Sequence, residues 1–426
     1  MDIRLQPHNI HLENPELFLC EDPHLKQLGK QALSHRSYLL DLLPRNKPGI
    51  YTLTGARQIG KTTLLKQWMN DLLSSRVNPE SIVYFTGEII DDHHVLIRLL
   101  TDVLEDMPHN ELRYILLDEV TYIKDWDKGV KFLADAGMLE DAVLFITGSD
   151  GAIIKEARMR FPGRRGKEQS VDFHMYPLNF LETVRLRKRL SAEAVEALVL
   201  SDDAESDFVE KLYEEFESFL MHGGFLTAMN DLEIHECIMP ATFSTYSDWI
   251  RGDMLKRNKQ ERYLFEILGA IVKRYGSQVT WNSLAKDLSI DHPRTIADYV
   301  NLLEEMDAVF VQSAIIEDKL AAAPKKARKL MFADPFIYHS IKSWLEPTRD
   351  PFKEQVVNVL GSSGQTSELV EATVITHYRR AFDTYYIKAE GEVDIAYVDG
   401  KTFFPVEIKW ARQIRPKDLK QISKYS

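Results

Sequence analysis

The segment at residues 55–62 constrains the fold of this chain more than any other, because it forms a complete phosphate-binding loop. It reads Gly-Ala-Arg-Gln-Ile-Gly-Lys-Thr and matches the pattern G-x-x-x-x-G-K-[ST]. An apolar run at 50–53 precedes it, and a helical segment begins directly after it. In such a strand–loop–helix unit, successive backbone N–H groups and the positive end of the helix surround phosphate groups. The sequence therefore predicts a P-loop α/β fold, with an incidental glycine-rich turn as the alternative.

Each residue type in this loop has its own task. Gly55 and Gly60 let the backbone turn tightly and approach a ligand. Lys61 reaches the β- and γ-phosphates of a nucleotide, and the Thr62 hydroxyl ligates Mg²⁺. We therefore expect ATP and Mg²⁺ at this loop. The predicted nucleotide-binding residues are Gly55, Arg57, Gln58, Ile59, Gly60, Lys61, Thr62 and Thr63.

Composition places the chain among ordinary globular proteins and excludes several other classes. Its 426 residues suffice for about three domains. The net charge of −12 excludes a protein coated in basic surface, although a local nucleic-acid groove is compatible with it. Two cysteines, Cys20 and Cys237, give neither a disulfide framework nor a metal-binding spacing, which favours the cytoplasm. No apolar run reaches the ~18 residues of a membrane span, so no membrane partner is expected.

Strands and helices alternate from residue 49 to about residue 180. The expected strands lie at 50–53, 82–86, 114–117 and 143–147, and the expected helices lie at about 61–75, 93–106 and 126–137. Such alternation predicts a parallel sheet that is covered by helices on both faces. A leader at 1–48 precedes it, with helical apolar spacing from Leu25 to Leu43. From about 181 to 258 the pattern is helical and is interrupted by Gly223-Gly224.

Polar residues follow two of the expected strands. Asp118 and Glu119 end the strand at 114–117, which places them at the ligand crevice of a parallel sheet. Asp118 would hold Mg²⁺ directly or through water, and Glu119 would deprotonate the attacking water. Thr147 and Ser149, after the next strand, are candidate sensors of the γ-phosphate. The alternatives are a strand end with solvated acids and an ordinary turn.

A basic run at 155–167 follows, with a Phe-Pro-Gly turn inside it. An arginine that reaches a neighbouring phosphate stabilises the charge of the transition state. Arg164 is the first choice for this role and Arg165 the second, supplied by the same chain or by a neighbouring copy. A solvated basic loop or a DNA-backbone patch explains the run equally well.

Further segments carry a resemblance to a known family. They are Leu-Leu-Asp-Glu-Val at 116–120, Thr-Gly-Ser at 147–149, Tyr-Pro-Leu-Asn-Phe-Leu-Glu at 176–182 and His-Gly-Gly-Phe at 222–225. With the loop at 55–62, they make the chain from about residue 48 onward resemble the bacterial and archaeal AAA-superfamily ATPases that carry a C-terminal domain of unknown function. The chain departs from that pattern at Thr121, where Gln is expected, and at Asn179, where Ser is usual.

The resemblance implies an ATPase core of the additional-strand, catalytic-glutamate type. In that type the strand that ends in the acidic pair is not adjacent to the strand that leads into the phosphate loop. The strand expected at 82–86, between the two along the chain, is consistent with this. The leader at 1–48 lies outside the family pattern.

A small α-rich unit at 259–320 resembles a winged helix-turn-helix. Three amphipathic helices, with a short turn between the second and third, precede an apolar strand at 309–311. On the third helix, Arg294, Thr295 and Tyr299 are expected to face outward and contact DNA. Acidic neighbours such as Asp298 oppose contact with phosphates, so a protein-packing module is an equal alternative.

The C-terminal segment carries a second candidate site. A helix with Glu371 precedes three strands that carry Asp394, Glu407 and Lys409, and this order resembles the PD-(D/E)xK nuclease superfamily. Asp394 and Glu407 would share Mg²⁺ or Mn²⁺ as oxygen ligands, and Lys409 would position the water or the scissile phosphate. An inactive nuclease-like fold is an equal alternative, and an unrelated hairpin with solvated charges is the third.

The predicted fold class is α/β: a P-loop NTPase parallel sheet with a helical lid, a winged helix-turn-helix module and a small C-terminal nuclease-like α/β domain. The predicted division is a leader at 1–48, a core at 49–180, a lid at 181–258, the helix-turn-helix at 259–320 and the nuclease-like domain at 330–426, with a basic loop at 321–329. We expect an ATPase whose nucleotide state is passed to a DNA- or protein-handling C-terminal part, in a possible homo-oligomer. A slow nucleotide-gated switch and an ATP-gated, metal-dependent DNA endonuclease are the alternatives.

Overall fold

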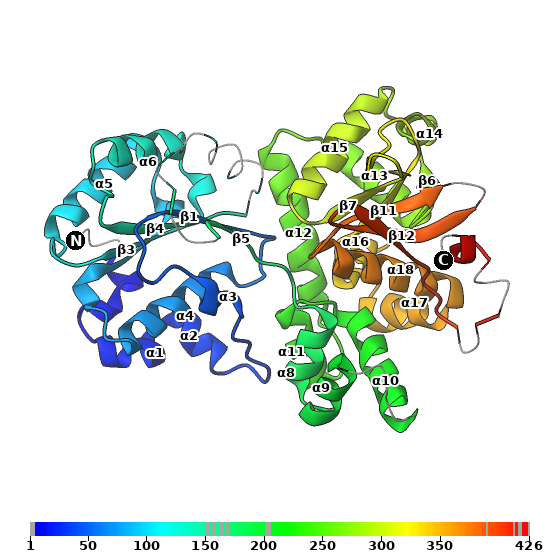
Figure 1. Ribbon diagram of the computed structural model, residues 1–426, viewed down its shortest axis with the longest axis horizontal. Helices are drawn as coiled ribbons and strands as arrows, with labels where there is room; N and C mark the ends of the chain where they lie inside the picture. The colour runs from blue at the N-terminus through cyan, green and yellow to red at the C-terminus, as the bar shows by residue number, and fades with distance from the viewer. Residues whose placement is uncertain are drawn as a thin grey trace. The chain divides into compact units, whose positions relative to one another are not determined.

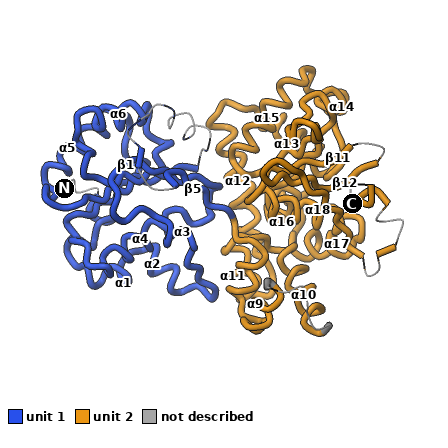
Figure 2. The backbone as a smooth tube through the Cα atoms, viewed as in Figure 1, with its two compact units in different colours: residues 1–176 blue, residues 177–426 orange. Residues whose placement is uncertain are grey.

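The computed structural model describes residues 5–149, 151, 154, 159, 161, 163, 165–166, 170–200, 206–388, 391–411, 414–415 and 420–424. The chain divides into two units, residues 1–176 and residues 177–426 (Figure 2). We call them the N-terminal unit and the C-terminal unit. No helix in the described part of the chain combines the length and the apolar character that a bilayer span requires.

A five-stranded parallel sheet forms the centre of the N-terminal unit, and this confirms the predicted fold class. Its strands stand in the order β2-β3-β4-β1-β5. Their bounds are β1 (Gly49–Thr54), β2 (Ile82–Thr86), β3 (Arg113–Asp118), β4 (Ala142–Thr147) and β5 (Asp172–His174). The strand β4 separates β1 from β3, so the predicted non-adjacency of the phosphate-loop strand and the acidic strand is confirmed. The strand that separates them is β4, whereas β2 lies at the edge of the sheet.

Helices cover both faces of this sheet (Figure 1). The helices α5 (His93–Asp106) and α6 (Trp126–Asp135) pack on one face, and α4 (Lys61–Ser74) packs on the other. Strand residues alternate between the two cores, as the period of two requires. In β3, for example, Ile115 and Leu117 join the core under α5 and α6, whereas Tyr114 and Leu116 join the core under α4. Continuous apolar runs therefore became fully buried strands.

The leader is part of the N-terminal unit. It contains the 3₁₀ helices η1 (Gln6–His8), η2 (Ile10–Leu12) and η3 (Pro15–Leu17), and the short α-helices α1 (Phe18–Glu21), α2 (Pro23–Leu28) and α3 (Leu39–Leu42). The helical apolar spacing from Leu25 to Leu43 therefore does not correspond to one continuous helix. Pro23 starts α2 after the capping side chain of Asp22, and the helix ends at Gly29. The apolar residues instead contribute separately to the core under α4.

Five helices open the C-terminal unit, which confirms the helical pattern expected at 181–258. They are α8 (Phe180–Arg187), α9 (Ala192–Leu200), α10 (Ser206–His222), α11 (Leu226–His235) and α12 (Pro240–Lys256). Gly223 and Gly224 separate α10 from α11. Gly223 has a φ of 55°, and a Cβ there would lie 1.7 Å from Asp334 Oδ1. The backbone N–H of Gly224 donates to Asp334 Oδ2 at 2.9 Å, so this turn holds a buried carboxylate that a side chain would displace.

Three helices and a small antiparallel sheet follow. The helices are α13 (Glu261–Lys273), α14 (Trp281–Asp287) and α15 (Pro293–Glu305). The sheet has the order β6-β10-β7, with β6 (Gln278–Val279), β7 (Val309–Ser313) and β10 (Arg328–Phe332). The strands β8 (Ile315–Ile316) and β9 (Ala321–Ala322) form a further pair. Residues 321–329 are therefore not a simple basic loop, since Arg328 and Lys329 belong to β10.

The last part of the C-terminal unit combines helices with an antiparallel sheet. Its helices are α16 (Pro335–Leu345), α17 (Val357–Gly361) and α18 (Ser363–Arg379), with a π-helix (Phe352–Val356) before α17. The sheet has the order β11-β12-β13, with β11 (Asp383–Lys388), β12 (Glu392–Asp399) and β13 (Thr402–Val406). Because β13 ends at Val406, Glu407 and Lys409 follow the strand instead of lying in it.

Candidate active site

The loop between β1 and α4 has a backbone shape that few residue types adopt. Gln58 and Gly60 take left-handed conformations, with φ of 61° and 98°. Gly55 has a φ of 147°, and a Cβ there would lie 2.3 Å from the carbonyl oxygen of Met175. Left-handed residues beside right-handed ones turn successive N–H groups toward a common point. The loop therefore has the form of a phosphate cradle at the N-terminus of a helix.

Lys61 is buried at the start of α4, and its ammonium group lies against the loop. The Nζ atom donates to the carbonyl oxygens of Gly55 and Ala56, both at 2.8 Å. Phosphate oxygens that replaced these carbonyls would meet a cation held in place by the loop itself. The structure thus places Lys61 where the sequence predicted it.

Asp118 is the centre of a group of hydroxyls. Its Oδ2 atom accepts hydrogen bonds from Thr62 Oγ1 at 2.6 Å and from the Tyr84 hydroxyl at 2.7 Å, and its Oδ1 atom accepts one from Thr147. Thr62 and Asp118 come from different elements, α4 and β3, and meet beside the loop. A hydroxyl and a carboxylate are the hard oxygen donors that Mg²⁺ prefers, so the residues present fit this ion.

Glu119 is held by donors on several sides. It has a left-handed backbone (φ 52°), and its N–H donates to Thr147 Oγ1 at 3.0 Å. Its Oε1 atom accepts from Thr121 Oγ1 at 2.7 Å, from Ser149 Oγ at 2.7 Å and from the Ser149 N–H at 3.0 Å. Burial alone would raise the pKa of Glu119, but the charge of Lys61 and these hydrogen bonds outweigh burial and hold the pKa below its usual value. Glu119 is therefore ionised at neutral pH, as a general base must be.

The remaining predicted residues of the loop differ in their contacts and exposure. Arg57 donates from Nε to Ser149 Oγ at 3.2 Å, and its guanidinium lies 5.6 Å from the ring centroid of Tyr122. Gln58 is exposed at the turn, Ile59 is buried, and Thr63 is half-buried in the first turn of α4. Ser149 and Thr147, the predicted sensors, thus contact Glu119 and Asp118 respectively. They connect the end of β4 to the acidic pair.

Of the two candidate arginines, the structure describes Arg165. Arg164 lies outside the described residues. Arg165 forms an ion pair with Asp172, and its backbone bridges to Ile50. Thr52 Oγ1 also donates to Asp172 Oδ1, at 2.6 Å. Arg165 is therefore engaged within its own unit, at the side of β1.

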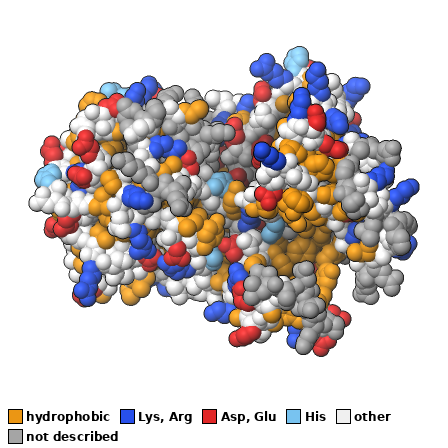
Figure 3. Space-filling view, in the orientation of Figure 1, with side chains coloured by type: hydrophobic (Ala, Val, Ile, Leu, Met, Phe, Trp, Pro, Cys, Tyr) orange, Lys and Arg blue, Asp and Glu red, His pale blue; other side chains and the backbone are white. Residues whose placement is uncertain are grey.

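The third helix of the small α-rich unit departs from prediction at one residue. Tyr299 was expected to face outward, but it is buried, and its hydroxyl accepts a hydrogen bond from the Gln260 N–H at 2.7 Å. The apolar stripe of α15 is wider than expected and includes this ring. Arg294 is exposed and Thr295 is half-buried. Lys and Arg side chains lie over α14 and α15, with Asp and Glu side chains beside them (Figure 3).

The C-terminal carboxylates are arranged differently from the predicted pair. Carboxylate oxygens of Glu371, Glu392 and Asp394 lie within 4.8 Å of one another. Lys329, which is 2% exposed, places its ammonium group against Glu371 Oε1 at 2.7 Å and also pairs with Glu392. Burial would lower the pKa of Lys329, but these two carboxylates outweigh burial and raise it. An internal cation thus pairs with two of the three carboxylates of this cluster.

Glu407 and Lys409 pair with each other instead of with the cluster. Lys409 Nζ lies 2.5 Å from Glu407 Oε1. Asp394 Oδ2 accepts a hydrogen bond from the Ile408 N–H at 2.8 Å, so its carboxylate supports the segment after β13. Burial raises the pKa of Glu407, with Lys409 opposing this. The structure brings Asp394 near Glu407, whose Oε1 atom pairs with Lys409 and whose Oε2 atom is buried without a hydrogen-bond partner among the described residues.

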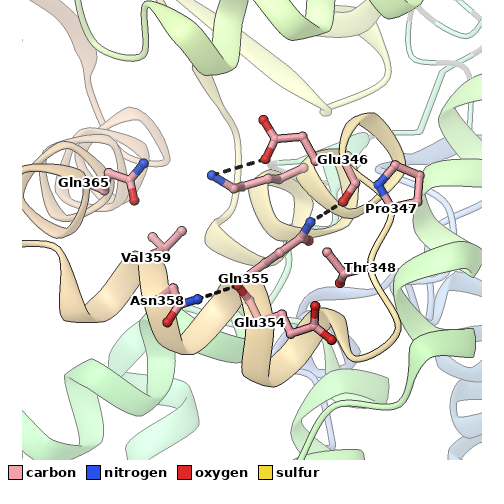
Figure 4. Close-up of a pocket in the computed structure, with 9 residues that line it drawn as sticks. Glu346, Pro347, Thr348, Glu354, Gln355, Asn358, Val359 and Gln365 are labelled. Carbon is pink, nitrogen blue, oxygen red and sulfur yellow. Dashed lines mark hydrogen bonds and ion pairs between the residues drawn. The ribbon is translucent and has the colours of Figure 1, made fainter.

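A separate cavity of about 340 Å³ opens between α16, the π-helix, α17 and α18 (Figure 4). Its lining is polar and of mixed charge, and includes Glu346, Thr348, Glu354, Gln355 and Gln365. Thr348 Oγ1 and Gln355 Oε1 are buried there without a protein partner. The lining combines two glutamates with a single lysine, so it does not favour a phosphate-bearing ligand.

Two contacts of the candidate sites, Tyr84 with Asp118 and Lys329 with Glu371 and Glu392, were not predicted from the sequence. Tyr84 gave no signal, because it stands inside an apolar run that reads only as a buried strand. Lys329 stood in a basic run that reads as a loop, and Glu392 stood among acids at the start of a strand. Contacts between segments this far apart along the chain leave no local pattern.

Two segments of the chain match different known protein families. Residues 47–184 match the family described as "AAA domain", and residues 213–348 match one described as a domain of unknown function. Neither match includes residues 349–426, so the nuclease resemblance stays a prediction.

Relatives and solved structures show more distant likenesses. The chain is 25% identical over 295 residues to an uncharacterized protein of Haemophilus influenzae, covering 65% of this chain and 66% of the relative. It is 23% identical over 288 residues to an uncharacterized protein of Methanocaldococcus jannaschii, covering 63% of this chain and 57% of the relative. The chain thus spans less than two thirds of the length of these relatives.

Among solved structures, the Walker-type ATPase of Pyrococcus abyssi has a TM-score of 0.44 at 16% identity, covering 69% of this chain and 91% of that one. The ORC2 protein of Aeropyrum pernix has a TM-score of 0.37 at 12% identity, covering 78% and 95%. At these values we draw nothing about function from either. Residues 47–184 thus match the family described as "AAA domain", and their parallel sheet and loop have the arrangement of a P-loop NTPase.

Proposed function

We propose that the protein binds and hydrolyses ATP at the β1–α4 loop and passes its nucleotide state to a C-terminal unit that handles DNA or a protein partner. The observation that carries the proposal is the meeting of Thr62 and Asp118 at 2.6 Å beside the cradle, with Glu119 next in the chain. A glycine-rich turn without this function has no reason to place a hydroxyl, a carboxylate and a buried lysine at one point.

Each group has a defined role in this proposal. The loop N–H groups and Lys61 bind and orient the β- and γ-phosphates. Thr62 and Asp118 hold Mg²⁺, which when bound compensates charge on those phosphates. Glu119 accepts the proton of the attacking water. Thr147 and Ser149 keep both carboxylates in position, because their hydroxyls donate to Asp118 and Glu119.

Two variants test this proposal. Lys61→Ala is expected to abolish tight ATP binding, measured by calorimetry with Mg²⁺. Glu119→Gln is expected to bind ATP normally and to hydrolyse it at least about 100-fold more slowly, which is the usual contribution of a general base. The matched control is Glu88→Gln, an exposed glutamate near the end of the neighbouring strand β2. Normal turnover by Glu119→Gln would show that the base is assigned to the wrong residue.

The proposal treats the C-terminal unit as a binding part and not as a nuclease. The support is Lys329, whose buried ammonium already pairs with Glu371 and Glu392, two of the three clustered carboxylates. We expect wild-type protein to leave plasmid and branched DNA uncut in Mg²⁺ and in Mn²⁺. Cutting that Asp394→Ala abolishes would establish the endonuclease instead.

ATP turnover with and without single-stranded, duplex and branched DNA separates the remaining choices. Stimulation by DNA supports a DNA-coupled ATPase. Near-zero turnover under all conditions, with tight ATP binding, supports the nucleotide-gated switch.

A further inference from the structure

We propose that Tyr84 is a positioning residue for the Asp118 carboxylate, and that the leader (residues 5–48) fixes Tyr84 in place. The leader would then be a working part of the Mg²⁺ site, although it lies outside the matched AAA domain. The proposal rests on the nucleotide function proposed above.

The first step is the contact between Tyr84 and Asp118. The Tyr84 hydroxyl donates to Asp118 Oδ2 at 2.7 Å, and Thr62 Oγ1 donates to the same oxygen at 2.6 Å. Tyr84 is 2% exposed and stands on β2, next to the strand that carries Asp118. Its hydroxyl thus lies beside the group that would hold the ion, and it constrains one of the two carboxylate oxygens.

The second step is the hydrogen bonding between the leader and the backbone of Tyr84. The strand β2 is at the edge of the sheet, so one side of it has no strand partner. Asn9 occupies that side: its Oδ1 accepts from the Tyr84 N–H at 2.7 Å, and its Nδ2 donates to the Tyr84 carbonyl at 2.8 Å. His11 makes a similar contact, from Nε2 to the Ile82 carbonyl at 2.9 Å. A single amide side chain therefore satisfies both main-chain groups of Tyr84.

The third step is the packing around the ring of Tyr84. Lys66 Nζ lies 3.7 Å from the ring centroid, in a cation–π contact. The same ammonium donates to the His8 carbonyl at 2.7 Å and lies 3.4 Å from Asp22 Oδ2. The side chains of Lys66 and Asp22 are 0% and 1% exposed. A lysine without its leader partners would be an unpaired buried charge, so the leader is required at this position.

The geometry connects these contacts to the phosphate loop. Lys66 follows Thr62 by four residues on α4, so the two side chains lie on one face of the helix. The leader therefore touches Tyr84 through Asn9 and touches α4 through Lys66, and both routes end at Asp118 Oδ2. A shift of the leader is expected to move the carboxylate relative to Thr62.

Mg²⁺-dependent binding of a fluorescent ATP analogue tests the proposal without relying on turnover. Tyr84→Phe removes only the hydroxyl. We expect the Mg²⁺ concentration for half-maximal binding to rise about fivefold, the effect of one lost hydrogen bond. Binding without Mg²⁺ and the melting temperature should stay close to wild type. The matched control is Tyr114→Phe, which removes another hydroxyl of the same sheet, one that donates to the Arg45 carbonyl.

A second variant tests the leader. Asn9→Ala is expected to raise the Mg²⁺ requirement in the wild-type background and to add nothing in the Tyr84→Phe background. Equal Mg²⁺ curves for Tyr84→Phe and Tyr114→Phe would overturn the role of Tyr84. Equal effects of Asn9→Ala in both backgrounds would overturn the route through the leader. Wild-type protein that binds no nucleotide at any Mg²⁺ concentration would instead refute the proposed function, and this inference with it.

Discussion

Lowering the pH from 7 to 5 is expected to weaken the C-terminal unit by about 2 kcal/mol through His377 alone. His377 stands on α18, where its Nδ1 lies 2.7 Å from the Thr373 carbonyl and its Nε2 accepts the Phe180 N–H at 2.9 Å. Since Nε2 is an acceptor, the ring is neutral. Burial, together with the charge of Arg380, lowers the pKa of His377 to about 4.

The sign and the size of this change in the free energy of unfolding follow from the pKa of His377. The folded-state pKa lies below the ordinary value of 6.5, so the unfolded chain takes up the proton first as the pH falls. The stability due to His377 is therefore complete above about pH 6.5 and is lost progressively between 6.5 and 4. At pH 5 the loss covers about 1.5 pH units at 1.36 kcal/mol each, or about 2 kcal/mol.

The assay is urea unfolding at pH 7 and at pH 5 for three proteins. His377→Gln keeps an acceptor for the Phe180 N–H but cannot titrate, so its stability should fall by about 2 kcal/mol less than that of wild type over this interval. His292→Gln, at an exposed histidine, is the control and should follow wild type. A His377→Gln variant that loses as much stability as wild type would refute the neutral-histidine reasoning.

Two further substitutions test packing in the C-terminal unit. Lys329→Met leaves Glu371 and Glu392 without their cation, and should destabilise the protein by about 3 kcal/mol in urea unfolding, whereas Met at the exposed Lys325 should have little effect. An equal response of both lysines would contradict the internal-cation assignment. Gly223→Ala brings a Cβ within 1.7 Å of Asp334 Oδ1 at a positive φ, and should lower the melting temperature, whereas Gly252→Ala meets no atom within 4 Å and should not. A Gly223→Ala protein as stable as wild type would show that this turn tolerates a side chain.

Sequence patterns were sufficient where a short segment decides its own structure. The strands at 82–86 and 143–147 were predicted almost residue for residue, because continuous apolar runs between polar turns have few other places in a soluble fold. The phosphate loop was recognised because its glycines, lysine and threonine are consecutive. Asp118 and Glu119 followed from the rule that ligands meet at the carboxyl ends of parallel strands.

Sequence patterns failed to predict the structure where contacts between segments distant along the chain determine it. The leader has helical apolar spacing, yet it folds as short pieces, because its leucines pack separately on α4 and the sheet. Tyr299 was expected to face outward with Arg294 and Thr295, but its side chain is buried, and its hydroxyl accepts a hydrogen bond from the backbone N–H of Gln260. The cluster of Glu371, Glu392 and Asp394 depends on Lys329, whose approach no local pattern in the sequence indicates.

The hydrogen bonds between Asn9 and the backbone of β2 have a practical consequence for anyone who shortens this protein. A fragment cut at residue 47, where the AAA match begins, would keep every predicted phosphate-binding residue but would expose main-chain hydrogen-bonding groups of the apolar edge strand β2. Exposed edge strands with unpaired N–H and C=O groups tend to form hydrogen bonds with strands of other chains. Such a fragment is expected to self-associate on purification, and a soluble catalytic fragment should therefore retain the leader.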